Sequence, residues 1–412
     1  MFYERALAKT LKNATETFPV VLLTGPRQVG KTTLFEHCAT PERTCLTLDD
    51  PQLRGAAKSD PRLFLQAHPE PLLIDEIQYA PELLPHIKMA VDSARQQGRE
   101  GREGRQGMFW LTGSQPFRLM RNVSETLAGR VAILELQGLS QAERFQRPAA
   151  PFVPGELPRD DARPPLGITA LYELIITGAF PALLAAPNMD KGLFHASYLK
   201  TYVERDVRDL ARVGDEHSFI KFLRVAAART AQLLNYSDMA RDVDVSVNTI
   251  KSWVSILEAS GIIYLLQPWH NNLTQRTVRT PKLYFLDTGL CSYLAGWKTA
   301  DALSNGVMNG SILETYVVSE ILKSHWHCGR EPRVWFYRDK ELREIDLLVE
   351  SENGLHPVEI KRTASPNPWD AKHFGALSKT RQPVGKGAVV CLYDKLIPLT
   401  ENVDIVPVSY LG

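Results

Sequence analysis

Gly25-Pro-Arg-Gln-Val-Gly30-Lys31-Thr32 is the stretch that decides the fold of the N-terminal third of the chain. It fits the pattern G-x-x-x-x-G-K-[ST] and stands between the apolar run 18–24 and a helical pattern, which is the context this motif requires. The glycines allow successive backbone N–H groups to point at phosphate oxygens, and the helix N-terminus adds its dipole. We expect Gly25 and Gly30 to shape the loop, Lys31 to reach the β- and γ-phosphates, Thr32 to ligate Mg²⁺ and Thr33 to contact the nucleotide. The stretch therefore predicts a site for ATP and Mg²⁺.

Two carboxylates end a second apolar run, Leu72-Leu-Ile-Asp75-Glu76, about fifty residues further on. At the carboxyl end of a parallel strand Asp75 would lie beside the phosphate loop and bind the metal, directly or through water. Glu76 could then polarise the attacking water as a general base. The pair turns a prediction of ATP binding into one of ATP hydrolysis.

A third strand, over 108–112, is followed by Ser114 and Gln115, either of which is a candidate to sense the γ-phosphate. Phosphoryl transfer also favours a cation on the leaving charge. Arg130 and Arg205 are the two candidates, and either could equally be a structural salt-bridge partner. Because apolar strands alternate with helical patterns, we predict an α/β core with a parallel sheet.

Composition places the chain among ordinary globular proteins. Its 412 residues are 44% hydrophobic, and 48 basic side chains nearly balance 47 acidic ones, so any basic surface has to be local. The five cysteines include no C-x-x-C pair, and no apolar stretch is long enough to span a bilayer. We therefore expect a soluble cytoplasmic protein without membrane partners. Two polar tracts, 95–107 and 144–167, have the composition of flexible insertions, and the sequence does not assign a role to either.

The region 237–266 has the outline of a winged helix-turn-helix. Ser237 and Ser246 would cap two successive helices, and Gly261 would end the second one before a β-rich run. One interpretation is sequence-independent contact with DNA phosphates, and the other is a lid or protein contact. The residues predicted to touch DNA are Asn248, Thr249, Lys251, Arg276, Arg279 and Lys282.

Four side chains near the C-terminus form a second candidate site. Glu314 falls on the apolar side of a predicted helix, Asp346 lies in a predicted strand, and Glu359 and Lys361 share one face of the next strand. The carboxylates could hold a second Mg²⁺ or Mn²⁺, and Lys361 could steady a hydroxide. This helix–strand–strand pattern resembles the PD-(D/E)-x-K nuclease fold, although salt bridges to Arg338 and Arg343 are an alternative for the acids.

Taken together, these strings resemble a bacterial and archaeal family of AAA-type P-loop ATPases with a C-terminal domain of unknown function. The further strings that carry the likeness are Leu-Asp-Asp-Pro at 48–51, Leu-Thr-Gly-Ser at 111–114, Leu-Ala-Gly-Arg at 127–130, Tyr-Val-Glu-Arg-Asp at 202–206, Tyr-Phe-Leu-Asp-Thr-Gly-Leu at 284–290 and Val-Glu-Ile-Lys at 358–361. The resemblance implies an AAA-type core, a winged helix, a nuclease-like domain and a homo-oligomer, with a ring as one option. We divide the chain into an ATPase core (1–145), a Pro-rich linker (146–168), a helical lid with the winged helix (169–300) and a nuclease-like domain (301–412).

Three functions fit this sequence. The first is a Mg-dependent ATPase that acts on DNA as a motor or remodeller, with a metal-dependent nuclease as an option. The second is an ATP-controlled regulatory or scaffold oligomer whose nuclease-like domain is inactive. The third is a defence nuclease gated by ATP.

Overall fold

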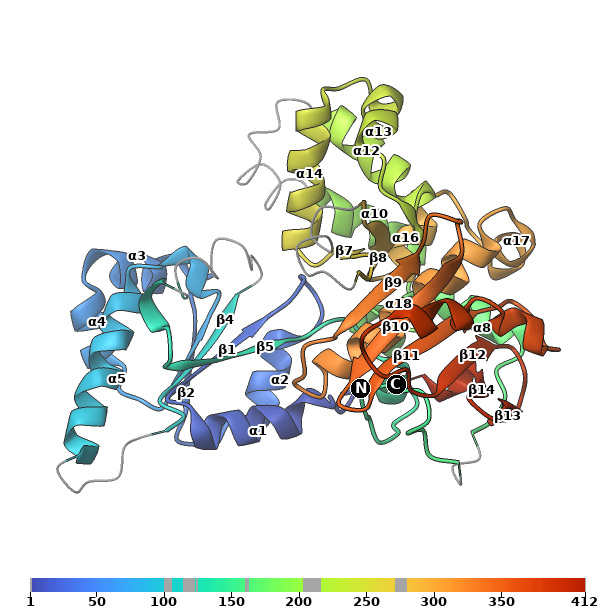
Figure 1. Cartoon of the computed structure of the whole chain (residues 1–412). Helices are drawn as coiled ribbons and strands as arrows, with labels where there is room; N and C mark the ends of the chain where they lie inside the picture. Colours follow the sequence, from blue (N-terminus) through green and yellow to red (C-terminus); the bar gives the residue numbers. More distant parts are fainter. Residues whose placement is uncertain are drawn as a thin grey trace.

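The computed structural model describes residues 2–99, 106–113, 123, 125–159, 163–202, 216–270 and 280–411, with backbone alone at 97–99 and 202. The strands within these ranges form sheets of five, three and six strands. In Figure 1 the five-stranded sheet and its helices lie at the left, and the other two sheets lie next to each other to the right of it. The chain is an α/β protein, as the alternation of strands and helices predicts.

The five-stranded sheet is parallel throughout and has the order β2-β3-β4-β1-β5. The central strands are apolar and buried on both sides, as is typical of a parallel sheet covered by helices. The three predicted strands are confirmed as β1, β3 and β4, whereas the sequence did not predict the two edge strands. The bounds are β1 (Val20–Thr24), β2 (Thr44–Thr47), β3 (Leu72–Asp75), β4 (Phe109–Gly113) and β5 (Val131–Glu135).

Helices cover both faces of this sheet. Helices α1 (Leu7–Thr17) and α2 (Lys31–Cys38) pack on one face, and α3 (Pro51–Ser59), α4 (Pro61–Ala67) and α5 (Leu83–Arg99) pack on the other. Because α5 continues to Arg99, the first residues of the expected 95–107 loop are helical, and that part of the prediction is wrong. Residues 100–105 of the tract lie outside the described ranges.

The expected insertion 144–167 is anchored where it is described. It follows the short helix α7 (Gln141–Arg144). The buried Phe152 donates its backbone N–H to Ser324 Oγ at 3.0 Å, and Arg147 donates to the carbonyl of Ser409 at 3.1 Å. The described part of this tract is therefore held against the C-terminal part of the chain and is not a free loop.

The middle unit, residues 168–305, is mostly helical and contains a small antiparallel sheet of order β6-β8-β7. Ser246 caps α14 as predicted, because its hydroxyl accepts from the N–H of Thr249 at 3.1 Å. Ser237 does not cap α13, since Asn235 accepts there instead. The elements are α8 (Ile168–Thr177), α9 (Pro181–Ala185), α10 (Lys191–Tyr202), α12 (Glu216–Ala228), β6 (Gln232–Leu233), α13 (Tyr236–Val243), α14 (Val247–Ala259), β7 (Ile263–Leu266), β8 (Lys282–Phe285), α16 (Thr288–Leu294) and α17 (Ala300–Asn305).

The C-terminal unit, residues 309–411, consists of the long helix α18 (Asn309–Trp326) and a mixed sheet of order β13-β14-β12-β11-β10-β9. The two strands predicted around Asp346 and Glu359 are present, and four further strands complete the sheet. The strands are β9 (Val334–Arg338), β10 (Glu344–Ser351), β11 (Gly354–Ile360), β12 (Gly387–Cys391), β13 (Ile397–Thr400) and β14 (Val403–Pro407). Short 3₁₀ turns elsewhere are η1 (Ile77–Tyr79), η3 (Pro368–Ala371), η4 (Phe374–Lys379) and η5 (Val408–Tyr410).

The apolar cores do not divide the chain in the same way as the three sheets do. The five-stranded sheet has two cores of its own, one on each face. One further core runs without a break through both the middle and the C-terminal units, from Phe152 to Leu411. Within the described ranges, none of the helices combines the length and the apolar character needed to cross a bilayer.

Candidate functional site

The phosphate loop between β1 and α2 has a conformation that depends on its glycines. Gly25 has φ +139°, and a Cβ there would lie 1.9 Å from the carbonyl oxygen of Leu136 in the chain after β5. Gly30, with φ +92°, is the residue from which α2 starts. Backbone in this region of φ is open mainly to glycine. The loop therefore closes tightly against the neighbouring strand and presents the start of α2 at the carboxyl edge of the sheet.

Lys31 is the first residue of α2, and its side chain folds back over this loop. The buried ammonium donates to the carbonyl oxygens of Gly25 at 3.0 Å and Pro26 at 2.7 Å. Thr32 follows it in the first turn, and Thr33 is exposed there. The cationic group thus lies within the loop that, by its motif, surrounds phosphates.

Asp75, at the end of β3, is the centre of a hydroxyl cluster. Its Oδ1 accepts from Thr32 Oγ1 at 2.8 Å and from Thr112 Oγ1 at 2.5 Å, and its Oδ2 accepts from Thr47 Oγ1 at 3.3 Å. Hard oxygen ligands of this kind suit Mg²⁺, which is typically held in nucleotide sites by one or two protein groups together with phosphates. The residues present therefore fit a nucleotide-bound magnesium ion.

Glu76 follows in a left-handed conformation, with φ +56° and ψ +46°. Its N–H donates to Thr112 Oγ1 at 3.1 Å, and its carboxylate accepts from the amide of Gln78. A non-glycine residue held in this region is costly and is typical of functional sites. The turn brings the backbone N–H of Glu76 against Thr112, which belongs to the Asp75 cluster.

Thr112 is a site residue that the sequence analysis missed. It is completely buried near the end of β4 and links Asp75, the last residue of β3, to the backbone of Glu76. Its neighbours Ser114 and Gln115, the predicted sensors, lie outside the described residues. The only sequence signal was a hydroxyl at the end of an apolar strand, and its partner depends on β4 lying between β1 and β3.

Of the two arginine candidates, Arg130 lies among the described residues. Arg130 lies at the amino end of β5, next to Val20 and opposite the phosphate loop, and it makes a two-pronged ion pair with Asp92 of α5 at 2.6 and 3.0 Å. In this position it cannot reach the nucleotide site of its own chain. Arg205 lies outside the described residues.

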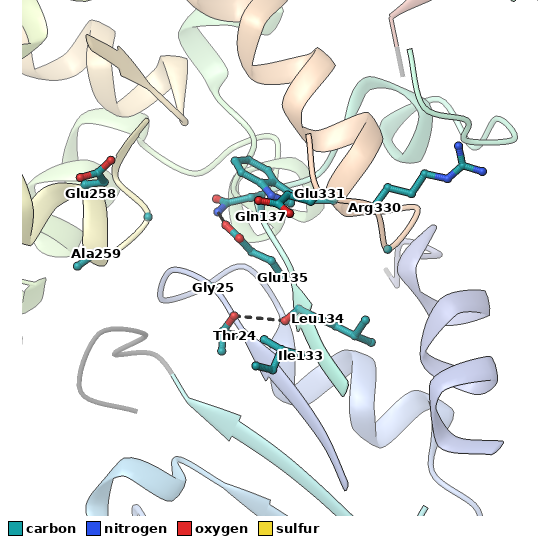
Figure 2. A pocket seen from close by; sticks show the side chains of 13 residues that line it. Thr24, Gly25, Ile133, Leu134, Glu135, Gln137, Glu258, Ala259, Arg330 and Glu331 are labelled. Atoms are coloured by element: carbon teal, nitrogen blue, oxygen red, sulfur yellow. Dashed lines mark hydrogen bonds between the residues drawn. The ribbon is translucent and has the colours of Figure 1, made fainter. Parts of the chain in front are cut away.

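A cavity of about 470 Å³ opens beside the first residues of the phosphate loop (Figure 2). Its walls come from all three units: Thr24 and Glu135 from the sheet, Glu258 from α14, and Arg330 and Glu331 from the chain after α18. Burial raises the pKa of Glu135 and of Glu258. The cavity is the place where the start of the phosphate loop faces the other two units.

The residues predicted to touch DNA fall into three groups. Asn248 and Lys251 are exposed on α14, whereas the hydroxyl of Thr249 is hydrogen-bonded to Ser246 at 2.8 Å. Arg276 and Arg279 lie outside the described residues. Lys282 is only 4% exposed, and its prediction as a DNA contact is wrong because its ammonium is ion-paired inside the protein.

The acidic residues of the C-terminal unit do converge. Glu314 of α18 accepts from Lys282 Nζ at 3.1 Å and from the hydroxyl of Tyr284 at 2.6 Å, both from β8. Asp346 of β10 accepts from the N–H of Ile360 at 2.8 Å. Glu359 of β11 and Lys361, which directly follows this strand, lie on the same side, as predicted, and pair at 2.6 Å. The alternative pairing of Glu314 with Arg338 or Arg343 does not occur, because Arg338 pairs with Glu344 and Arg343 with Asp339.

The protonation of this cluster reflects crowded carboxylates. Burial, and then the charge of Asp346, raise the pKa of Glu314 to about 7 and that of Glu359 to about 8. Burial also raises the pKa of Asp346. Among the described residues, no group of three or more His, Cys, Asp or Glu side chains is arranged to hold a metal ion. The described residues therefore contain no preformed site for the second Mg²⁺ or Mn²⁺ that the sequence predicts.

The raised pKa of Glu359 predicts that the stability of the protein depends on pH. With a pKa of about 8 in the folded protein, against about 4.3 for an ordinary glutamate, the folded state binds a proton that the unfolded chain lacks. The free energy of unfolding should therefore fall as pH rises between about 4.5 and 8. In Glu359→Gln this loss should be smaller, as measured by urea denaturation at pH 5, 7 and 8.5. Glu341→Gln, at a largely exposed side chain, is the control, and an unchanged pH profile in Glu359→Gln would contradict the prediction.

Comparison with known proteins divides the chain into three parts. Residues 17–145 match the model of an AAA domain. Residues 168–301 and 309–411 each match a domain of unknown function (DUF8612 and DUF4143). Uncharacterized proteins Rv2008c of Mycobacterium tuberculosis and Mb2031c of Mycobacterium bovis are each 29% identical over 408 residues, which is 99% of this chain and 84% of theirs.

Solved structures are similar at a lower level. The Walker-type ATPase PABY2304 of Pyrococcus abyssi is 14% identical with a TM-score of 0.44, over 71% of this chain and 96% of that one. The STAND protein PH0952 of Pyrococcus horikoshii is 11% identical with a TM-score of 0.26, over 78% and 45%. Scores this low carry no inference about function. The AAA-domain match and the loop geometry together identify residues 17–145 as a P-loop ATPase domain of the AAA type, a class that uses ATP and Mg²⁺.

Proposed function

We propose that this chain is a magnesium-dependent ATPase that binds DNA through its middle unit and acts on it. The observation that carries the proposal is the exposed face of α14. This helix is the second of two consecutive helices, α13 and α14, and is followed by strands β7 and β8 of the small sheet. In a winged helix the helix at this position is the one that enters the groove of DNA.

In the ATPase domain, the proposed roles follow from the contacts around Asp75. Lys31 would neutralise charge on the β- and γ-phosphates, and Thr32 with Asp75 would hold the metal ion. Bound Mg²⁺ would offset phosphate charge, while Glu76 orients and deprotonates the attacking water. Thr112 fixes both acidic residues and is the described residue best placed to respond to the γ-phosphate.

On α14, the polar groups face solvent at the beginning of the helix. Asn248, Lys251 and Ser252 are exposed, while Ile250 and Trp253 face the core. Lys251 Nζ lies 5.8 Å from the ring centroid of Tyr236, which limits its freedom without removing its charge. One cation and two neutral polar groups suit contact with phosphates better than the reading of base sequence.

A second candidate function is the ATP-controlled regulatory oligomer with a silent nuclease-like domain. It is favoured by one observation, the two lysine ammonium groups that already pair with the C-terminal carboxylates. A nuclease gated by ATP would need these carboxylates free for a metal ion. Arg130 could complete a nucleotide site only across an oligomer interface, and its pair with Asp92 favours a structural role.

DNA-stimulated ATP turnover is the test of the main proposal. We expect duplex DNA to raise the ATPase rate of the wild type and to bind with a salt-dependent Kd. Lys251→Glu should weaken binding and reduce the slope of log Kd against log salt by about 1. Lys58→Glu, at an exposed lysine of α3, should leave both quantities unchanged. Absence of stimulation by duplex, branched and single-stranded DNA, with no salt-dependent binding, would favour the regulatory oligomer.

A further inference from the structure

The acidic cluster of the C-terminal unit already contains a cation, and that cation comes from the middle unit. Lys282, the first residue of β8, places its ammonium 3.1 Å from Glu314 Oε1 of α18 and 2.7 Å from Glu344 Oε1 of β10. The lysine side chain is 5% exposed. One ammonium thus joins carboxylates from a helix and a strand that the chain brings together only in the folded state.

The neighbouring groups show that this position is built for a cation. Tyr284, two residues along β8 and so on the same face of the strand, donates to the same oxygen of Glu314 at 2.6 Å. In the same acidic cluster, Glu359 is 7% exposed and its Oε2 has no hydrogen-bond partner, although its Oε1 pairs with Lys361. A buried carboxyl oxygen without a partner is costly, because it has lost its hydrogen bonds to water.

We propose that Lys282 is an internal substitute for a divalent cation and keeps the C-terminal acidic site closed to Mg²⁺ and Mn²⁺. The inference rests on the proposed nuclease-like character of this unit and deepens it by naming what regulates the site. A buried ammonium and a divalent cation compete for the same carboxylate oxygens and repel one another. The ammonium lies about 3 Å from its partners, whereas Mg²⁺ requires oxygens at about 2.0–2.1 Å, so the side chains cannot serve both at once.

Lys282 and the carboxylates that it pairs with belong to different units of the chain. Lys282 and Tyr284 belong to the sheet that follows α14, while the acids belong to the C-terminal unit. The metal site would therefore become available only if β8 and α18 moved relative to each other or if the lysine side chain withdrew. A nuclease-like site is in this way tied to the position of the proposed DNA-binding unit.

Manganese binding to the full-length, nucleotide-free protein tests the proposal, with free Mn²⁺ measured by electron paramagnetic resonance. Wild type should show no site that depends on Asp346. Lys282→Met, which keeps the length of the side chain and removes its charge, should gain one Mn²⁺ per chain, and Lys282→Met/Asp346→Asn should lose it. Arg338→Met is the matched control, because it removes a cation 3.5 Å from Glu344 but leaves the lysine in place, and it should gain no Mn²⁺.

Two results would overturn the proposal. One is a wild-type protein that binds Mn²⁺ at a site abolished by Asp346→Asn, a result that can be obtained even if the lysine variant does not fold. The other is a folded Lys282→Met, with wild-type circular dichroism and melting temperature, that gains no site. Because the readout is metal binding without nucleotide or DNA, it is independent of the ATPase assays and can fail or succeed separately from them.

Discussion

Lys31→Ala is expected to reduce ATP turnover at least about 100-fold, the order of loss seen when one preorganised donor to a developing charge is removed. In the wild type the buried ammonium is held over the phosphate loop by the carbonyls of Gly25 and Pro26, so it needs little reorganisation when phosphates arrive. Alanine keeps the helix and removes the charge. The measurement is steady-state phosphate release at saturating ATP and Mg²⁺, with basal rates taken in the absence of DNA.

The control for this variant is Lys58→Ala, which removes an exposed lysine of α3 from the same domain. Its turnover should equal that of the wild type. Circular dichroism of both variants should match the wild type, because alanine favours the helical conformation at both positions. A Lys31→Ala protein that is folded and hydrolyses ATP at the wild-type rate would show that the assignment of this lysine is wrong.

Arg5→Met is expected to destabilise the protein by about 3–5 kcal/mol, the typical cost of breaking a buried ion pair from one side. Arg5 precedes α1, and its guanidinium is almost completely buried. It donates to Glu143 Oε1 at 3.0 Å, to the carbonyl of Val29 in the phosphate loop at 2.7 Å and to the carbonyl of Gln137 at 2.8 Å. Methionine fills a similar volume but leaves one buried carboxylate and two carbonyls without this donor.

The remaining partners of Glu143 cannot make up for the loss. Burial opposes ionisation of this carboxyl, yet the charges of His327 and Arg5 hold its pKa well below the usual range. Burial lowers the pKa of His327, so this histidine replaces the permanently charged guanidinium of Arg5 only in part. The free energy of unfolding from urea titration is the measurement. The double variant Arg5→Met/Glu143→Leu should regain part of the stability, since it leaves no unpaired charge.

Two outcomes would count against this account of Arg5. If Arg5→Met lowers the free energy of unfolding by less than about 1 kcal/mol, the ion pair contributes no more than an exposed one does. A double variant no more stable than Arg5→Met would mean that the carboxylate is not the source of the cost. The matched control is Arg241→Met, whose ion pair with Asp238 is mostly exposed and should contribute little.

The parts of the fold that could be predicted are those governed by local sequence. The phosphate loop follows from glycine geometry between a strand and a helix, and the central strands follow from apolar runs such as 72–75. Strand β2 lies at the edge of the sheet, is exposed at three of its four residues and includes two threonines, so it has no apolar run to reveal it. Strand β5 does contain an apolar run, Val-Ala-Ile-Leu at 131–134, which the prediction missed.

The candidate site was predictable where its groups lie on one element or belong to a motif, as Thr32 and Asp75 do. Glu359 lies in β11 and Lys361 directly follows its last residue, so the alternation of the strand is enough to put both on one side. Thr112 and Asp75 meet because β4 lies next to β3, an order that the sequence does not encode locally. Lys282 looked like an unbalanced surface cation because its acidic partners, Glu314 and Glu344, are 32 and more residues away in the chain.

The continuous core between the middle and C-terminal units has a consequence for how such chains can be inherited. The sequence families change near residue 300, yet Trp253 and Phe219 belong to the same apolar core as Val317 and Val390. A recombination event at that boundary would cut through one core and leave two fragments with exposed apolar faces. The ATPase domain, whose two cores are its own, is the natural unit of exchange, while the other two units can be expected to travel together.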